Sequence, residues 1–325
     1  MKNFIYTLEE KINNGSPINE EDALKIVAAP DEDIYDIIAS ANRIRRKFKG
    51  ERINLCSIIN AKSGLCPEDC AFCSQSAKNN SEVAVYELVE KEKIVCEAKR
   101  AASNGAGRFG IVTSGKGVTP QDLNVIAASI EEITCSSNIK ACASLGILAK
   151  GELTSLKKAG LKRYHHNLET AESFFPNICS SHSYQENIDT VRAAKEIGLQ
   201  VCCGGIFGMG ETNEQRVELA LTLRELNVDS VPLNFLNPIK GTKMEGRPLL
   251  PPIEALKIIA MHRFILPDKD IKAAGGRSVV LRDLQSLLFA AGANSMMVGD
   301  YLTTKGRQVS DDIQMVADLG LKTED

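Results

Sequence analysis

From residue 52 onward, short runs of β-branched and other apolar residues alternate with longer stretches in which apolar residues recur at helical spacing. We count eight runs of each kind. The predicted strands span residues 53–60, 108–113, 139–144, 163–166, 200–204, 230–235, 270–274 and 294–298. The predicted helices include residues 88–105, 122–133, 184–198, 213–227, 252–265 and 281–292. Several of these end at glycine, which is a common helix stop.

Eight strand and helix pairs in about 250 residues predict an α/β fold, a (β/α)8 barrel of the TIM type. A doubly wound sheet is the alternative, because element counts taken from one sequence are approximate. Residues 1–51 show two helical patterns and are expected to form an N-terminal helical extension. The barrel is then expected at residues 52–304 and a C-terminal tail at 305–325. In such a barrel, chemistry belongs at the C-terminal ends of the strands and in the loops after them.

Charge and composition narrow the class of protein. The 325 residues include 39 basic and 42 acidic side chains, and this near-neutral balance predicts no nucleic-acid or anionic-membrane partner. There is no uninterrupted apolar run long enough to span a membrane, and the N-terminus lacks the apolar stretch of a signal peptide, so we expect a cytoplasmic protein. Ten cysteines in a reducing compartment are unsuited to a disulfide framework. Some of them are therefore expected to hold metal.

One group of cysteines is tightly clustered. Directly after the first predicted strand, KSGLCPEDCAFCSQS places Cys66, Cys70 and Cys73 in a CxxxCxxC spacing. Three thiolates on one loop can hold three irons of a [4Fe-4S] cluster and leave the fourth iron open to bind a substrate. Zinc is the alternative, but structural zinc normally takes four protein ligands, and this loop carries no fourth Cys or His. Cys56, which could close a tetrahedron, lies awkwardly inside the strand.

This loop, with Phe72 just before its last cysteine, resembles the signature of the radical S-adenosylmethionine (SAM) superfamily. The resemblance implies that the open iron chelates SAM. It also implies that one electron from the cluster cleaves SAM to methionine and a 5′-deoxyadenosyl radical. The run GGIFGMGET, with Ile206 and Glu211, is similar to the superfamily's segment beside the adenine. A glycine-rich strand-to-helix turn is the alternative; the run lacks the GxGxxG of a dinucleotide site.

Longer phrases resemble the biotin synthase family, in that family's order along residues 53–304. They are NAKSGLCPEDCAFCSQS, YHHNLET, VCCGGIFGMGET, DSVPLNFLNPIKGT and GANSMMVGDYLTT. The resemblance implies a sulfurtransferase that inserts sulfur between two saturated carbons of dethiobiotin, with SAM consumed to make the radical that removes each hydrogen. Unactivated C–H bonds are too weakly acidic for a general base, so the cofactor must supply the reactivity while the protein supplies positioning.

The same resemblance implies roles for individual residues. Asn167 and Glu169 would lie at the SAM ribose. Asn234 would pair with the ureido ring of dethiobiotin, to which an amide offers both a donor and an acceptor. The other substrate candidates are His165, where the family commonly has Asn, and Thr303 and Thr304, near the carboxylate tail. Loop capping and turn formation are the alternative roles.

The sequence departs from the family at the second, auxiliary cluster. Biotin synthases of the familiar kind hold a [2Fe-2S] cluster with three strand cysteines and one arginine. Here Cys142 and Cys202 match, but Gly110 and Lys272 replace the other two ligands. Cys56 compensates on the first strand, and alternate strands contribute side chains to one layer of a barrel. We hypothesise an auxiliary cluster held by the three cysteines with Lys272 nearby, either [2Fe-2S] or a larger four-iron type.

Alternatives to these interpretations stay open. Cys142 and Cys202 could be buried, unliganded thiols. Another enzyme of the same clan, such as a hydrogenase maturase or methylornithine synthase, could share the barrel and cluster loop, and a non-catalytic iron–sulfur or zinc scaffold is a third class. The resemblance further implies an electron donor such as flavodoxin or ferredoxin, and a homodimer. The remaining cysteines, Cys96, Cys135 and Cys203, are expected to be ordinary thiols, with Cys179 a further ligand candidate.

Overall fold

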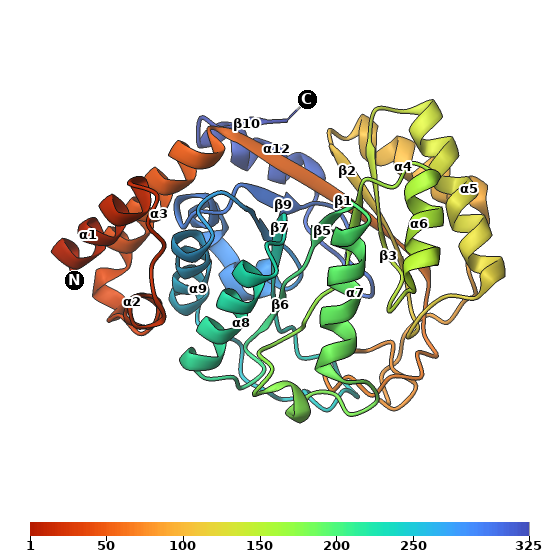
Figure 1. The fold of residues 1–325 in the computed structure, drawn as a ribbon, viewed down its shortest axis with the longest axis horizontal. Helices are drawn as coiled ribbons and strands as arrows, with labels where there is room; N and C mark the ends of the chain where they lie inside the picture. The colour runs from red at the N-terminus through yellow and green to blue at the C-terminus, as the bar shows by residue number, and fades with distance from the viewer. Residues whose placement is uncertain (325) are drawn as a thin grey trace.

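A closed parallel sheet forms the centre of the molecule in the computed structural model, which describes residues 1–324 (Figure 1). Its strands are β1 (Arg52–Lys62), β2 (Arg108–Thr113), β3 (Lys140–Ser144), β4 (Arg163–His165), β5 (Gln200–Cys202), β6 (Gly205–Phe207), β7 (Ser230–Phe235), β8 (Asp270–Ala273) and β9 (Ser295–Met297). Each pairs in parallel with its neighbours, and β1 pairs with both β2 and β9. The barrel prediction is confirmed, and closure of the sheet rules out the doubly wound alternative.

Together, β5 and β6 occupy the fifth strand position of the barrel, where the sequence predicts one strand over 200–204. The strand is interrupted at Cys203 and Gly204, and two other backbone segments pass close to Gly204 and Gly205. A Cβ on Gly204 would lie 2.1 Å from the carbonyl oxygen of Pro232, and one on Gly205 would lie 2.6 Å from that of Glu169. Only glycine fits this approach. The YHHNLET loop can therefore lie directly against the strand.

Helices surround the barrel. They are α4 (Lys91–Ser103), α5 (Pro120–Ser136), α6 (Lys150–Lys158), α7 (Tyr184–Glu196), α8 (Asn213–Glu225) and α9 (Pro252–Ile265). The side chains of Thr119, Ser183 and Thr212 cap α5, α7 and α8 by accepting a backbone N–H from the first turn. These local signals explain why the helix positions could be predicted.

One predicted helix, over residues 281–292, is wrong as a continuous element. The segment divides into α10 (Arg277–Leu281), the 3-10 helix η3 (Arg282–Ser286) and α11 (Leu287–Ala290). Arg282 has a φ of +48°, which a right-handed helix cannot contain. The apolar spacing is helical throughout, so the break could not be read from that spacing.

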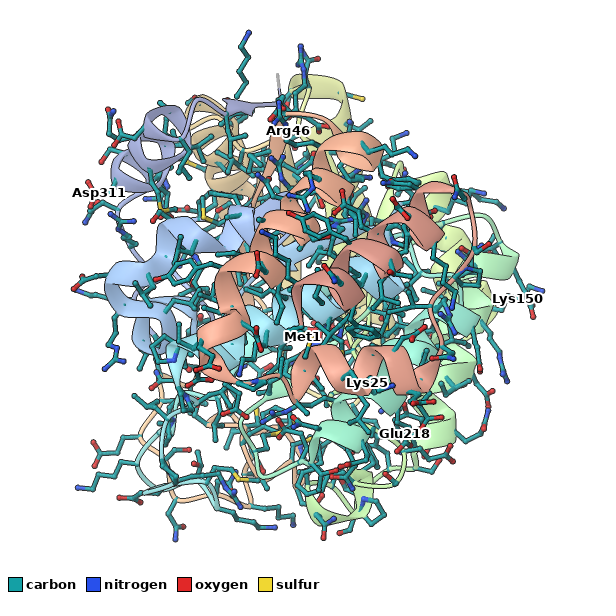
Figure 2. All side chains as sticks on the ribbon, turned by 90° about the vertical axis from the view of Figure 1, so that its left-hand side faces the viewer. Met1, Lys25, Arg46, Lys150, Glu218 and Asp311 are labelled. Carbon is teal, nitrogen blue, oxygen red and sulfur yellow. The ribbon has the colours of Figure 1, made fainter. Side chains whose placement is uncertain are left out.

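Three helices precede the barrel: α1 (Lys2–Asn13), α2 (Glu20–Val27) and α3 (Ile34–Lys49). They pack against α8 and α9 on one side of the molecule (Figure 1), and Figure 2 looks onto them, with Met1 and Lys25 labelled. Every residue of α9 from Ala255 to Ile265 is buried. Burial on every side is expected of a helix that is covered on both sides, here by the barrel and by the extension, and the buried basic side chains of α9 donate to backbone oxygens.

The C-terminal segment returns to the first strand. Helix α12 (Val309–Asp318) carries the buried Asp312, which pairs with Arg277. The short strand β10 (Lys322–Thr323) then adds in parallel to the start of β1. Residues 305–324 are thus part of the packed structure. None of the helices in residues 1–324 is long and apolar enough to cross a membrane.

Candidate functional site: a thiol layer below a three-cysteine loop

Strand register brings the inner cysteines into one layer of the barrel. Cys56 on β1 is level with Arg108 on β2, which is level with Lys140 on β3, and Cys142 lies two residues further along β3. The same two-residue step leads from Cys142 across β4 to Cys202 on β5. In a tilted barrel, side chains at one height are displaced in this way from strand to strand.

The layer is completed by Lys272 on β8. Two further steps of two residues lead from Cys202 across β7 to Lys272, and from Lys272 across β9 back to Cys56. Four such steps give the shear of eight that characterises this barrel type. Cys56, Cys142, Cys202 and Lys272 therefore come from alternate strands and share one layer.

The thiol layer contains a buried positive charge, that of Lys272. The ammonium nitrogen of Lys272 lies 3.7 Å from the sulfur of Cys202, and both side chains are buried. Burial by itself would raise the pKa of Cys202, but the charge of Lys272 and the contact with His165 outweigh it and lower this pKa to about 5. Burial raises the pKa of Cys142. The lowered pKa of Cys202 favours its thiolate form, which is the form that binds iron–sulfur clusters.

Gly110, where the family resemblance led us to expect a ligand cysteine, lies close to Ile58, so a larger side chain would require Ile58 to shift. A Cβ built on Gly110 would lie 3.1 Å from the Cγ2 atom of Ile58 on β1. Ile58 and Gly110 both line the cavity.

A residue that the sequence analysis missed also borders the layer. Arg163 on β4 is level with Cys142, lines the same cavity and forms an ion pair of 3.3 Å with Asp270. The alternation of sides along a strand could have found it, because Arg163 lies two residues before His165, a predicted substrate residue.

The CxxxCxxC loop lies at the C-terminal end of β1. Backbone bonds shape it: Cys66 N–H donates to Gln75 (3.0 Å), and Cys73 N–H donates to Cys70 (3.1 Å). The side chain of Asn79 donates to the carbonyls of Cys70 and Cys73 at 3.2 and 2.8 Å. All three thiols border one cavity of about 230 Å³. This donor set fits a cluster bound through three thiolates.

A second cavity, of about 340 Å³, runs from this loop to the thiol layer. The predicted site residues that line it are Cys56, Phe72, Cys73, Cys142, His165, Asn167, Glu169, Cys202, Ile206, Asn234, Lys272, Thr303 and Thr304. Cys66 and Cys70 border only the neighbouring cavity. The structure therefore brings nearly all of the predicted residues to one connected region.

The YHHNLET loop forms one wall. Asn167 accepts from the Gly204 N–H (3.2 Å) and donates to the Glu169 carboxylate (3.3 Å). Glu169 has a φ of +67°, and its carbonyl accepts the N–H of Ile206 at 2.8 Å. Burial raises the pKa of Glu169 to about 7. This unusual backbone and the raised pKa are typical of a functional loop.

Glu211 borders neither cavity. Its buried carboxylate accepts the N–H groups of Gly208 (2.9 Å) and Met209 (2.8 Å), and Arg216 donates to it at 2.9 Å. These contacts hold the glycine-rich turn in shape. A contact of Glu211 with the cofactor stays a prediction.

Two of the predicted substrate residues form hydrogen bonds with neighbouring segments of the barrel. Asn234 donates to the Gly205 carbonyl (3.2 Å) and accepts the Gly275 N–H (2.9 Å), so its amide is oriented from two sides. The hydroxyls of Thr303 and Ser74 lie 3.0 Å apart, which links the loop after β9 to the cluster loop.

Comparisons with known proteins agree with this geometry. Residues 62–223 match the family model of the radical SAM superfamily, and residues 232–322 match the Biotin and Thiamin Synthesis associated domain. The chain is thus an enzyme of the radical SAM superfamily, whose members use a [4Fe-4S] cluster and SAM. It is 50% identical to the biotin synthase of Carboxydothermus hydrogenoformans over 324 residues, 99% of this chain and 100% of that one. It is 51% identical to the biotin synthase of Pelobacter propionicus over 322 residues, covering 99% of this chain and 98% of that one. The chain belongs to the biotin synthase family.

Solved structures share the fold at lower identity. Methylornithine synthase (PylB) superposes with a TM-score of 0.85 at 20% identity, covering 98% of this chain and 97% of that one. The FeFe-hydrogenase maturase HydG from Carboxydothermus hydrogenoformans gives 0.83 at 18% identity, covering 98% and 79%. At this identity the likeness shows the barrel and its extension only.

Proposed function

We propose that this enzyme inserts sulfur into dethiobiotin to form biotin, with the layer of Cys56, Cys142 and Cys202 holding an auxiliary iron–sulfur cluster as the sulfur donor. The observation that carries the proposal is the single cavity that runs from Phe72 and Cys73 to this layer. A substrate bound in that cavity would lie between the radical-forming end and the sulfur-bearing end. Membership of the biotin synthase family supports the same substrate.

The proposed binding residues divide between the two ends. Cys66, Cys70 and Cys73 would hold the [4Fe-4S] cluster; when bound, it and SAM supply the radical that abstracts hydrogen from an unactivated C–H bond. Asn167 and Glu169 would bind the SAM ribose. Substrate contacts are proposed for Asn234, His165, Thr303 and Thr304, with the oriented amide of Asn234 on the ureido ring. Apolar wall residues such as Ile58 and Ile206 would exclude water from the radical.

The type of auxiliary cluster, the electron donor and the assembly complete the proposal. With two family ligands replaced, three thiolates and the Lys272 ammonium suit either a [2Fe-2S] or a four-iron cluster. We further propose reduction by a flavodoxin or ferredoxin, a homodimeric assembly and a cytoplasmic location, as the family resemblance and the sequence lead us to expect. A hydrogenase maturase or methylornithine synthase activity is supported only by likeness of fold.

The direct test is to incubate the reduced, reconstituted enzyme with dethiobiotin and SAM without oxygen and to measure biotin and 5′-deoxyadenosine. We expect both products. Cys70→Ala should abolish both, because it removes a ligand of the cluster that cleaves SAM.

The variant Cys202→Ala distinguishes the functions of the two ends of the cavity. It should still form 5′-deoxyadenosine but no biotin, because the cluster loop is untouched while the thiol layer is broken. Cys203→Ala is the matched control, since Cys203 is buried in the core on the opposite side of the strand and borders neither cavity. Biotin formation by Cys202→Ala at the parental rate would show that the layer is not the sulfur donor.

A further inference from the structure

Beside the cluster loop, two segments far apart in the sequence bring three metal-binding side chains together. Glu68 lies inside the CxxxCxxC loop, and Cys179 and His182 lie in the segment that precedes α7. The Nδ1 atom of His182 is 2.5 Å from the Glu68 carboxylate and 3.3 Å from the sulfur of Cys179. The three ligand atoms all lie within 4.8 Å of one another, and Glu68 and Cys179 are buried.

A separate set of hydrogen bonds holds this trio in place. The Asp69 carboxylate accepts the N–H groups of Ser180 (2.9 Å) and Ser181 (3.1 Å), and the Ser181 hydroxyl donates to Glu68 at 2.7 Å. The two segments are therefore fastened by Asp69 with Ser180 and Ser181, and Ser181 also orients the Glu68 carboxylate. Ligands oriented in this way by outer partners are characteristic of metal sites.

The donors themselves suit zinc. A thiolate, an imidazole nitrogen and a carboxylate oxygen are its usual ligands, and three protein ligands leave a fourth tetrahedral position open. Glu68 and Cys179 are buried, and the negative charges of a carboxylate and a thiolate would together neutralise a divalent cation bound between them.

The sulfur of Cys70 lies 3.8 Å from that of Cys179. A tetrahedral zinc ion bound by two thiolates at about 2.3 Å holds their sulfur atoms roughly 3.8 Å apart. In contrast, thiolates on two different irons of a cubane point outward from separate corners and lie farther apart. Cys179 is thus positioned to share one metal ion with Cys70, and not to fill the open iron of the cluster.

We propose that Glu68, Cys179 and His182 form a zinc site, whose fourth position is taken by Cys70 when the [4Fe-4S] cluster is absent. Zinc and the cluster then compete for Cys70. When the [4Fe-4S] cluster is present, water occupies the fourth position, and water binds zinc less tightly than a thiolate does. The zinc site does not depend on the sulfur-insertion chemistry.

The test uses the full chain purified without oxygen and without its cluster, with Co²⁺ as the spectroscopic probe. We expect one Co²⁺ per chain at this site, with the near-ultraviolet charge-transfer absorption of a cobalt thiolate and displacement by Zn²⁺. Cys179→Ser and His182→Ala should weaken binding by more than about tenfold, since even an outer partner of a metal ligand typically contributes this much. His182→Gln keeps a polar side chain but has no imidazole nitrogen, so it should weaken Co²⁺ binding as His182→Ala does. The same loss in this milder variant would show that the loss does not come from misfolding.

Cys66→Ala is the matched control on the same loop, and Cys96→Ser removes an exposed thiol on α4. Both should bind Co²⁺ within about twofold of the parent. Loss of binding in Cys66→Ala with retention in His182→Ala would overturn the proposal, because the metal would then sit on the CxxxCxxC thiols alone.

Competition is tested by reconstitution. Saturation with Zn²⁺ should slow the appearance of iron–sulfur absorption in the parent but not in His182→Ala. Equal rates with and without zinc in the parent would refute competition for Cys70. Neither experiment measures biotin, so failure here is distinct from failure of the proposed function.

Discussion

At the residue scale, the notable feature is a lysine buried among thiols. A buried ammonium is costly unless it is paired, and Lys272 has Cys202 as its nearest partner at 3.7 Å. Despite its burial, the pKa of Lys272 is raised, because Cys202 and Cys56 favour its charged form. The lysine and the thiolate layer therefore stabilise each other.

Replacing Lys272 tests this dependence. Lys272→Met removes the charge at similar length, so we expect iron and sulfide in the reconstituted enzyme to fall toward the content of one four-iron cluster. SAM cleavage should persist. Lys272→Arg, which keeps the charge, should retain more iron than Lys272→Met. Equal iron content in both variants and the parent would show that the cation does not stabilise the auxiliary cluster.

At the element scale, one carboxylate ties the extension to the base of the barrel. Asp270, the first residue of β8, contacts Lys49 of α3 at 2.8 Å, Arg163 of β4 at 3.3 Å and the Asn294 amide at 3.0 Å. Burial would raise the pKa of Asp270, but Lys49 and Arg163 hold it well below its usual range. The ionised carboxylate thus stabilises the junction of three elements.

Asp270→Asn should lower the free energy of unfolding by about 3 kcal/mol, because it leaves the buried Arg163 without its counter-charge. Urea denaturation of the cluster-free chain measures this change. Glu196→Gln breaks an exposed pair with Lys150, in which both side chains are about 60% exposed, and should cost less than about 1 kcal/mol. Similar losses in the two variants would contradict a special role for Asp270.

At the scale of the whole molecule, buried histidines link stability to pH. Burial lowers the pKa values of His166 and His262 to about 4. His166 donates to the Asn187 amide oxygen (2.9 Å), and His262 donates to the Ile258 carbonyl (2.8 Å). A histidine whose folded pKa is depressed stabilises the fold above its unfolded pKa, near 6.5, and loses this contribution as pH falls toward 4.

Comparing the parent with His262→Leu isolates one histidine from other titrating groups, such as Glu169, whose raised pKa acts in the opposite direction. Leucine does not titrate. Relative to the parent, the free energy of unfolding of His262→Leu should therefore improve by about 2 kcal/mol between pH 7 and pH 5. Urea denaturation at both pH values provides the measurement, and an unchanged difference would mean that His262 titrates normally.

The sequence by itself determined the features that depend on neighbouring residues. Short runs of β-branched and other apolar residues predicted all eight barrel strands, and helical spacing predicted the helices between them. The spacing of Cys66, Cys70 and Cys73 predicted a shared metal on one loop. The thiol layer was also predictable, because strand order and alternation of sides fix which positions face the barrel interior.

Only the tertiary structure decided what depends on distant segments. The contact of Cys70 with Cys179 and the ion pair of Arg163 with Asp270 each join residues more than 100 positions apart. The left-handed Arg282, which interrupts a helical pattern, is likewise invisible to apolar spacing. Periodicity records which side of an element is buried, whereas loop conformation and pairing between loops follow from packing of the whole chain.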